Sequence, residues 1–113
     1  DKIAMALAMG ADLVNIARGM MFSVGCIQAE VCHTNQCPVG VATTDPKKQK
    51  ALIVEEKFYR TCNYVISLRE GLFNLAAAVG IDSPTKFQQH HVVYRDAEGR
   101  VESLPDLLVK EQI

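Results

Sequence analysis

The chain has 113 residues, a formal net charge of −1 and 49% hydrophobic residues. This apolar fraction is typical of a packed globular core. The nearly balanced charge excludes a basic surface for nucleic acid and a polybasic membrane segment. The longest uncharged stretch, GMMFSVGCIQA, is far shorter than the roughly 20 residues that a membrane helix needs.

Cysteine usage indicates the cellular compartment. The opening segment, DKIAMALAMGAD, has no basic stretch followed by a long apolar run, so we expect no secretory signal. Without such a signal, four cysteines favour a reducing compartment, where clustered thiols more often bind metal than form disulfides. We therefore expect a cytoplasmic protein.

The first elements in chain order predict an α/β unit. Apolar residues at helical spacing over 3–8 are followed by Gly10, which is placed to end a helix. The short apolar run Leu13 to Ala17 predicts a buried strand, and residues 18–24 predict a short helix directly after it. Because one such unit cannot form a sheet, we expect the C-terminal piece of a larger α/β domain.

Residues 54–79 have the strongest periodicity in the chain, with apolar side chains recurring at intervals of three and four. The pattern predicts one continuous helix that ends at Gly80. We expect its buried face to contain Phe58, Cys62, Val65, Leu72 and Ala76.

The last third of the chain predicts small elements. Ser83 followed by Pro84 is typical of a helix start. The segment HHVVYRDAEGRVES predicts two short strands joined by a turn at Glu98 and Gly99, and residues 104–110 predict a final short helix.

The loop CIQAEVCHTNQCPVG, residues 26–40, places three cysteines at the spacing C-x5-C-x4-C and follows the last with proline. These thiols, Cys26, Cys32 and Cys37, lie in a polar segment, so burial in a core does not explain them. Cys62 differs because it lies on the apolar stripe of the long helix, where we interpret it as a small buried side chain.

Two metal chemistries compete for this loop. Zinc needs a fourth ligand to complete a tetrahedron; His33 is available, but it is adjacent to Cys32, and neighbouring residues seldom reach one metal together. Iron–sulfur chemistry fits better, because thiolates are its usual ligands and a cysteine–proline ending recurs in such sites. Three cysteines favour a cluster with three iron atoms, with His33, Thr34 and Asn35 placed to hydrogen-bond its sulfurs.

The segment GADLVNIARGMMFSVGCIQAEVCHTNQCPVGVATTDP resembles the C-terminal part of the FMN-binding synthase domain of glutamate synthase. The resemblance continues through VEEKFYRTCNYVISLREGLFNLAAAVGI and covers about three quarters of the chain. The tail after Ser83 is similar only to the shorter FMN-binding relatives. The resemblance implies a 3Fe-4S cluster held by Cys26, Cys32 and Cys37.

The resemblance also implies the fold and the flavin site. The family domain is a (β/α)8 barrel of about 250 residues, so we expect residues 1–82 to be its C-terminal fragment and residues 83–113 to be a C-terminal extension. Backbone N–H groups of Ala17, Arg18 and Gly19 would contribute to binding the FMN phosphate. This stretch is poorer in glycine than in the larger family members, and the alternative is an ordinary turn with a solvated Arg18.

The implied function is that of one part of a glutamate synthase-type oxidoreductase. The cluster would relay electrons from a donor, either ferredoxin or a nicotinamide-dependent subunit, to FMN, for reductive formation of L-glutamate from 2-oxoglutarate and nitrogen from ammonia or glutamine. We assign no catalytic residue to this chain and expect the fragment alone to be inactive. Two alternatives remain open: a non-catalytic module stabilised by zinc, and a family member that has lost its cluster and activity.

Overall fold

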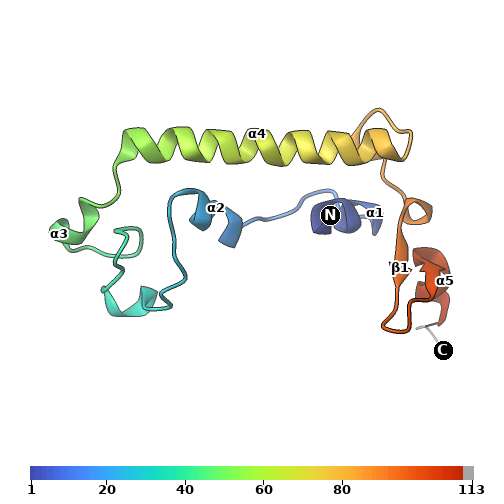
Figure 1. Cartoon of the computed structure of the whole chain (residues 1–113), viewed down its shortest axis with the longest axis horizontal. Coiled ribbons are helices and arrows are strands. Elements are labelled where there is room, and N and C mark those ends of the chain that lie inside the picture. Colours follow the sequence, from blue (N-terminus) through green and yellow to red (C-terminus); the bar gives the residue numbers. More distant parts are fainter. Residues whose placement is uncertain (111–113) are drawn as a thin grey trace. The chain divides into compact units, whose positions relative to one another are not determined.

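The computed structural model describes residues 1–110 of the chain. It divides into two compact units: one contains Asp1–Val14 and the described residues from Arg69 onward, and the other contains Asn15–Leu68. The long helix α4 (Val54–Ala78) supplies residues to both units and is continuous over 25 residues, as the periodicity predicts (Figure 1). Among the described helices, none combines the length and the hydrophobicity needed to cross a membrane.

The first unit begins with helix α1 (Lys2–Ala8), whose first N–H group is capped by the Asp1 carboxylate. At its other end Gly10, with φ of +102°, donates its N–H to Leu7, and the Ala11 N–H reaches back to Ala6. These paired bonds satisfy the last free carbonyls of the helix and require a left-handed residue that glycine adopts without strain. The predicted glycine stop is therefore confirmed.

Helix α4 ends in the same way. Gly80 has φ of +81° and donates to Ala77, while the Ile81 N–H donates to the Ala76 carbonyl. The turn brings the chain back over the helix end, where a small apolar core forms. This core contains Ala4, Ala8, Ala76 and Phe87, with Leu7, Leu72, Ile81 and Val92 packed against it.

The tail of this unit contains four short elements and a final helix. They are the 3-10 turns η2 (Pro84–Lys86) and η3 (Gln89–His91), the strands β1 (Val93–Arg95) and β2 (Val101–Ser103), and helix α5 (Leu104–Lys110). The Ser83 hydroxyl caps η2 by accepting the N–H of Thr85, as expected for a Ser–Pro start. The strands pair antiparallel with Tyr94 opposite Glu102, so the predicted hairpin and final helix are confirmed.

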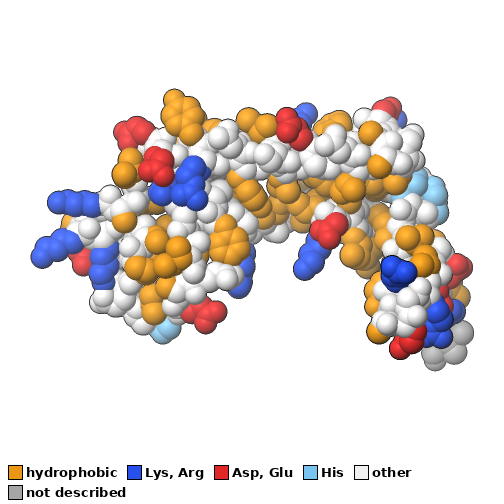
Figure 2. Space-filling view, in the orientation of Figure 1, with side chains coloured by type: hydrophobic (Ala, Val, Ile, Leu, Met, Phe, Trp, Pro, Cys, Tyr) orange, Lys and Arg blue, Asp and Glu red, His pale blue; other side chains and the backbone are white. Residues whose placement is uncertain are grey.

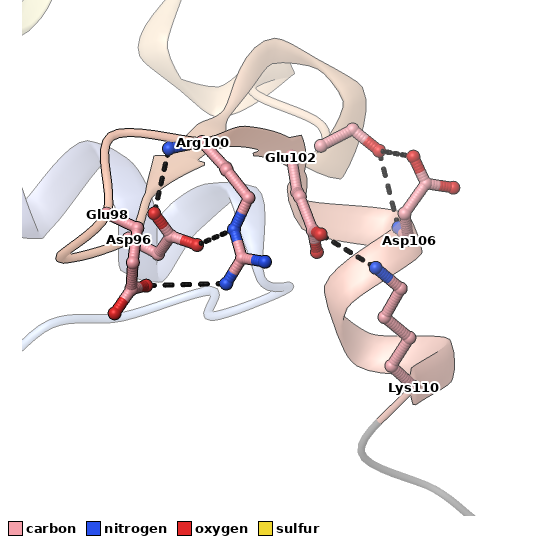
Figure 3. Close-up of polar contacts among 7 residues, drawn as sticks. Asp96, Glu98, Arg100, Glu102, Asp106 and Lys110 are labelled. Atoms are coloured by element: carbon pink, nitrogen blue, oxygen red, sulfur yellow. Dashed lines mark hydrogen bonds and ion pairs between the residues drawn. The ribbon is translucent and has the colours of Figure 1, made fainter.

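The hairpin turn is held by Asp96 and Arg100 (Figure 3). The Asp96 carboxylate accepts the backbone N–H of Arg100 at 2.8 Å and its guanidinium Nε at 2.7 Å, and Arg100 also reaches Glu98 at 3.3 Å. The hydrogen bond from the Arg100 side chain holds the pKa of Asp96 below its usual value. Gly99, with φ of +84°, completes the turn at the predicted place.

The second unit carries the cysteine loop. Its elements are α2 (Arg18–Ser23), the 3-10 turn η1 (Cys32–Thr34), the short helix α3 (Pro46–Gln49) and the first part of α4. The buried Ser23 hydroxyl lies 3.1 Å from the Thr61 hydroxyl of α4, which links α2 to the long helix. The predicted short helix after residue 17 is confirmed.

The predicted strand from Leu13 to Ala17 is not formed. This segment is irregular and has no ladder partner, and among the described residues the sheet consists of the two strands of the hairpin. A strand needs a ladder partner, and Leu13, expected to be buried, is 90% exposed. The described chain is therefore mostly helical with one small antiparallel sheet.

The predicted buried face of α4 is partly wrong. Ala76 is buried and Leu72 half-buried, but Phe58 is 60% and Val65 46% exposed. Cys62, also predicted to be buried, is half-buried. The other side chains that are covered form a neighbouring row together with Leu72 and Ala76: Lys57, Thr61, Tyr64 and Leu68. Apolar residues occur on more than one face of this helix, so periodicity alone does not identify the packed one; apolar side chains also reach the surface over α4 (Figure 2).

The difference between the predicted and the observed buried face of α4 can be tested by replacing two of its side chains with alanine in the 113-residue chain. Phe58→Ala should cost less than about 1 kcal/mol, because an exposed ring loses little burial, whereas Leu72→Ala, at the small core, should cost about 2 kcal/mol. Thermal unfolding of the two variants measures the difference. A larger loss for Phe58→Ala would favour the face that the periodicity predicts.

Candidate iron–sulfur and flavin site

A cavity of about 300 Å³ in the second unit lies between the start of α2 and the first half of the cysteine loop. It is lined by Ala17, Arg18, Met21, Phe22, Cys26, Gln28, Glu30 and Cys32. Two of the three predicted ligands and two of the three predicted flavin-binding residues therefore share one cavity. Arg18 brings a positive charge to a lining that is otherwise largely apolar, with Glu30 opposite in sign.

The two cysteines on this cavity differ in exposure. Cys26 is half-buried, and its sulfur accepts the backbone N–H of Gln28 at 3.5 Å. Cys32 is exposed and begins the 3-10 turn η1. Both are free thiols, so both are available as ligands.

Cys37 lies in a different environment. It is buried, at 8% exposure, and is not part of the cavity lining. A hydrogen bond from the backbone of Ala42 lowers the pKa of its thiol, and the backbone groups of Val39, Val41 and Gly40 act in the same direction, while burial opposes them. The backbone after Pro38 therefore favours the thiolate of Cys37, the form that binds iron.

The loop backbone is constrained between the cysteines. Among the described residues, the non-glycine residues with positive φ are Gln28 (56°), Glu30 (57°) and Asn35 (63°). The first two lie between Cys26 and Cys32, and the third lies between Cys32 and Cys37. Such conformations are unfavourable and persist where the surroundings impose them, which is characteristic of functional loops.

The chemistry of the donor set fits an iron–sulfur cluster, because the loop supplies three free thiols, a backbone N–H that donates to the Cys26 sulfur, and a backbone that lowers the pKa of Cys37. The candidate ligands are not all gathered in one place, however. Within residues 1–110, no group of three or more histidine, cysteine or acidic side chains is gathered closely enough to hold a metal ion. Cys26 and Cys32 line one cavity, but Cys37 does not.

The other candidate ligands are now placed as well. His33 is exposed in η1, next to Cys32, and Cys62 is half-buried on α4 as a free thiol. Neither lines the cavity. The Thr34 hydroxyl donates to the Val31 carbonyl at 2.7 Å, which holds the 3-10 turn. The predicted hydrogen bonds from His33, Thr34 and Asn35 to cluster sulfurs stay a prediction.

Gly19, predicted to bind the flavin phosphate, has a packing role in this structure. A Cβ at this position would overlap the Tyr64 hydroxyl of α4 and approach the Ile16 side chain at 3.0 Å. Sequence reasoning missed Tyr64, because nothing in the periodicity distinguishes it from the other aromatic residues of α4. Glycine is therefore needed here for the close approach of α2 to α4.

The close packing of Gly19 against Tyr64 can be tested by a substitution and a second substitution that relieves its effect. Gly19→Ala should lower the free energy of unfolding by about 1 kcal/mol or more, because the new methyl group displaces the Tyr64 ring. Tyr64→Phe removes the overlapping oxygen and should recover most of that loss in the double variant. A double-mutant cycle measured by denaturant unfolding gives the coupling. Equal destabilisation by Gly19→Ala in both backgrounds would show that this contact is not limiting.

Comparison with known proteins identifies the family. The model of the conserved region in glutamate synthase matches residues 1–82, which include the cavity and all three loop cysteines, so the chain belongs to the glutamate synthase family. No solved structure matches the chain.

Three relatives illustrate the range of the family. The chain is 72% identical over 108 residues to the glutamate synthase large subunit-like protein YerD of Bacillus subtilis (strain 168), covering 96% of the chain and 21% of that protein. It is 36% identical over 83 residues to a ferredoxin-dependent glutamate synthase of Cyanidium caldarium, covering 74% and 5%. An archaeal-type glutamate synthase [NADPH] of Thermotoga sp. (strain RQ2) is 30% identical over 90 residues, covering 80% and 18%. The chain thus spans about a fifth of its Bacillus relative.

Proposed function

We propose that this chain is part of a glutamate synthase-type iron–sulfur flavoenzyme, in which Cys26, Cys32 and Cys37 hold a 3Fe-4S cluster. The observation that carries the proposal is the cysteine loop: it lies inside the family-matched region and is shaped by left-handed residues in both intervals between its thiols. In this proposal residues 1–82 are the C-terminal fragment of a (β/α)8 barrel domain, and residues 83–113 form a C-terminal extension.

The chain's own groups would stabilise and tune the bound state. The backbone after Cys37 favours its thiolate form, a backbone N–H donates to the Cys26 sulfur, and hydrogen bonds to ligand sulfurs adjust the potential of a cluster. The use of free thiols suits a reducing compartment, so the proposal places the protein in the cytoplasm.

The flavin part of the proposal assigns backbone N–H groups of Ala17, Arg18 and Gly19 to the FMN phosphate, with the Arg18 guanidinium compensating its charge. Ala17 and Arg18 support this assignment because they line the same cavity as Cys26 and Cys32. When bound, the cluster and FMN would supply the electron transfer that reduces an imine of 2-oxoglutarate to L-glutamate. No catalytic residue of this chain is proposed.

The reductant in this proposal is ferredoxin or a nicotinamide-dependent subunit, since relatives of both descriptions match the chain. The nitrogen source is ammonia or glutamine.

The test is an assay of the full-length protein with 2-oxoglutarate, either ammonium or glutamine, and either reduced ferredoxin or NADPH. Glutamate formation that requires 2-oxoglutarate and one reductant is the expected result. A protein that carries its cluster and flavin but forms no glutamate with any of the four combinations would contradict the proposed reaction.

A further inference from the structure

Asn35 occupies a special backbone position in the cysteine loop. It follows η1 directly, two residues before Cys37, with φ of 63° and ψ of 14°. Asparagine tolerates this left-handed conformation better than most residues, and glycine and aspartate tolerate it too. The backbone requirement alone therefore does not specify asparagine.

The side chain of Asn35 has a second role. Its Oδ1 accepts the backbone N–H of Thr44 at 2.7 Å and is 3.1 Å from each of the hydroxyl groups of Thr43 and Thr44. The Thr43 hydroxyl also lies 2.8 Å from the Asn35 carbonyl oxygen. One oxygen thus gathers donors from a segment eight and nine residues further along the chain.

These bonds close a loop, and they attach it to the next helix. The Thr43 hydroxyl accepts the N–H of Asp45, which in turn caps α3 by accepting the N–H of Lys47. The Thr43 carbonyl accepts the Gln49 side chain at 2.9 Å. Residues 35 and 44 are therefore the fixed ends of a closed loop.

Cys37 lies within that closed loop, and its side chain is buried. Because the loop between residues 35 and 44 is short and both of its ends are held, the direction of the Cys37 side chain depends on the bonds that close this loop. Several of these bonds are made by the side-chain oxygen of Asn35, so a single substitution removes them.

We propose that Asn35 is a positioning residue for Cys37: its side-chain oxygen fastens residue 35 to Thr43 and Thr44 and so fixes the loop that buries this thiol. The consequence for metal binding rests on the proposed function, in which Cys37 is a cluster ligand. The role of Asn35 in fixing the loop around Cys37 does not depend on the proposed function.

Three variants separate the parts of this proposal. Asn35→Gly keeps the left-handed backbone but removes the oxygen, and Asn35→Asp keeps both the backbone and an acceptor at the same place. Thr44→Val leaves Asn35 in place and removes one donor from the other end of the closure. Cys62, on α4 and outside the loop, is the internal reference thiol.

The measurement is the alkylation rate of each thiol by iodoacetamide, followed by mass spectrometry in full-length protein from which iron has been removed. In Asn35→Gly the Cys37 rate should rise about tenfold relative to Cys62, the factor that corresponds to about 1.4 kcal/mol of local opening. Asn35→Asp should stay within about twofold of the wild type, and Thr44→Val should lie between the two.

An unchanged Cys37 rate in Asn35→Gly overturns the proposal, and so does an Asn35→Asp variant as reactive as Asn35→Gly. An equal rise at Cys62 also overturns it, because that pattern shows general unfolding. Iron content before iron removal tests the other part: Asn35→Gly should retain less iron than Asn35→Asp. If the wild type itself binds no iron while the alkylation pattern holds, the proposed cluster fails and the positioning of Cys37 stands.

Discussion

Replacing Gly40 by alanine is expected to lower the free energy of unfolding by about 3 kcal/mol. Gly40 has φ of +79°, and a Cβ there would lie 2.5 Å from the Lys48 carbonyl oxygen, 3.1 Å from Gln49 Cα and 3.3 Å from the Leu52 backbone nitrogen. These atoms all belong to the backbone in or just after α3, so none of them moves aside as the end of a side chain does. The cost of the strained backbone and the cost of the steric overlap therefore both lower the free energy of unfolding.

Two other glycines provide matched controls in thermal or denaturant unfolding. Gly10 has φ of +102°, and a Cβ there would have nothing within 4 Å, so Gly10→Ala measures the backbone strain alone, about 1 kcal/mol. Gly71, inside α4, also has open space and no positive φ, so Gly71→Ala should stabilise by about 0.5–1 kcal/mol. If Gly40→Ala costs no more than Gly10→Ala, α3 does not pack against residue 40 as described.

Replacing any one of the three loop cysteines by serine is expected to abolish binding of the proposed cluster, which is the largest functional effect that we expect. A serine hydroxyl is nearly isosteric with the thiol but is a much poorer ligand for iron. Cys26→Ser and Cys32→Ser alter the cavity lining only slightly, and Cys37→Ser keeps a group of similar size that accepts hydrogen bonds at the buried position. Loss of iron in these variants would therefore reflect lost ligation rather than lost folding.

The matched control is Cys62→Ala. Because Cys62 lies on α4 outside the cavity, this variant should keep its iron and visible absorption. Iron content is measured for the four variants in full-length protein purified without oxygen. A loop variant that keeps full iron removes that cysteine from the site, and loss of iron from Cys62→Ala would make Cys62 a fourth ligand.

Local patterns predict most of the elements. The glycine stops at Gly10 and Gly80, the continuous helix α4, the Ser83 cap and the turn at Gly99 each depend on residues close in sequence, and each is present. These features follow from backbone hydrogen bonding over a few residues. The cysteine loop is likewise recognisable from its spacing and its family resemblance.

Features that depend on distant partners are not predictable in this way. Leu13 to Ala17 has the composition of a strand, yet strand formation requires a neighbouring strand, which composition does not report. Helix α4 has apolar residues on several faces, so its packing against Gly19 through Tyr64 is not evident from the sequence. The bonds from Asn35 to Thr43 and Thr44 span eight and nine residues of irregular chain, and no periodic signal marks them.

The most direct test of the central claim is the metal content and visible spectrum of the full-length protein purified without oxygen. The proposed site predicts about three iron atoms per chain, acid-labile sulfide and a broad absorption band in the visible region. A colourless protein that contains one zinc ion per chain and no iron would contradict the proposed site and favour a zinc-stabilised module instead.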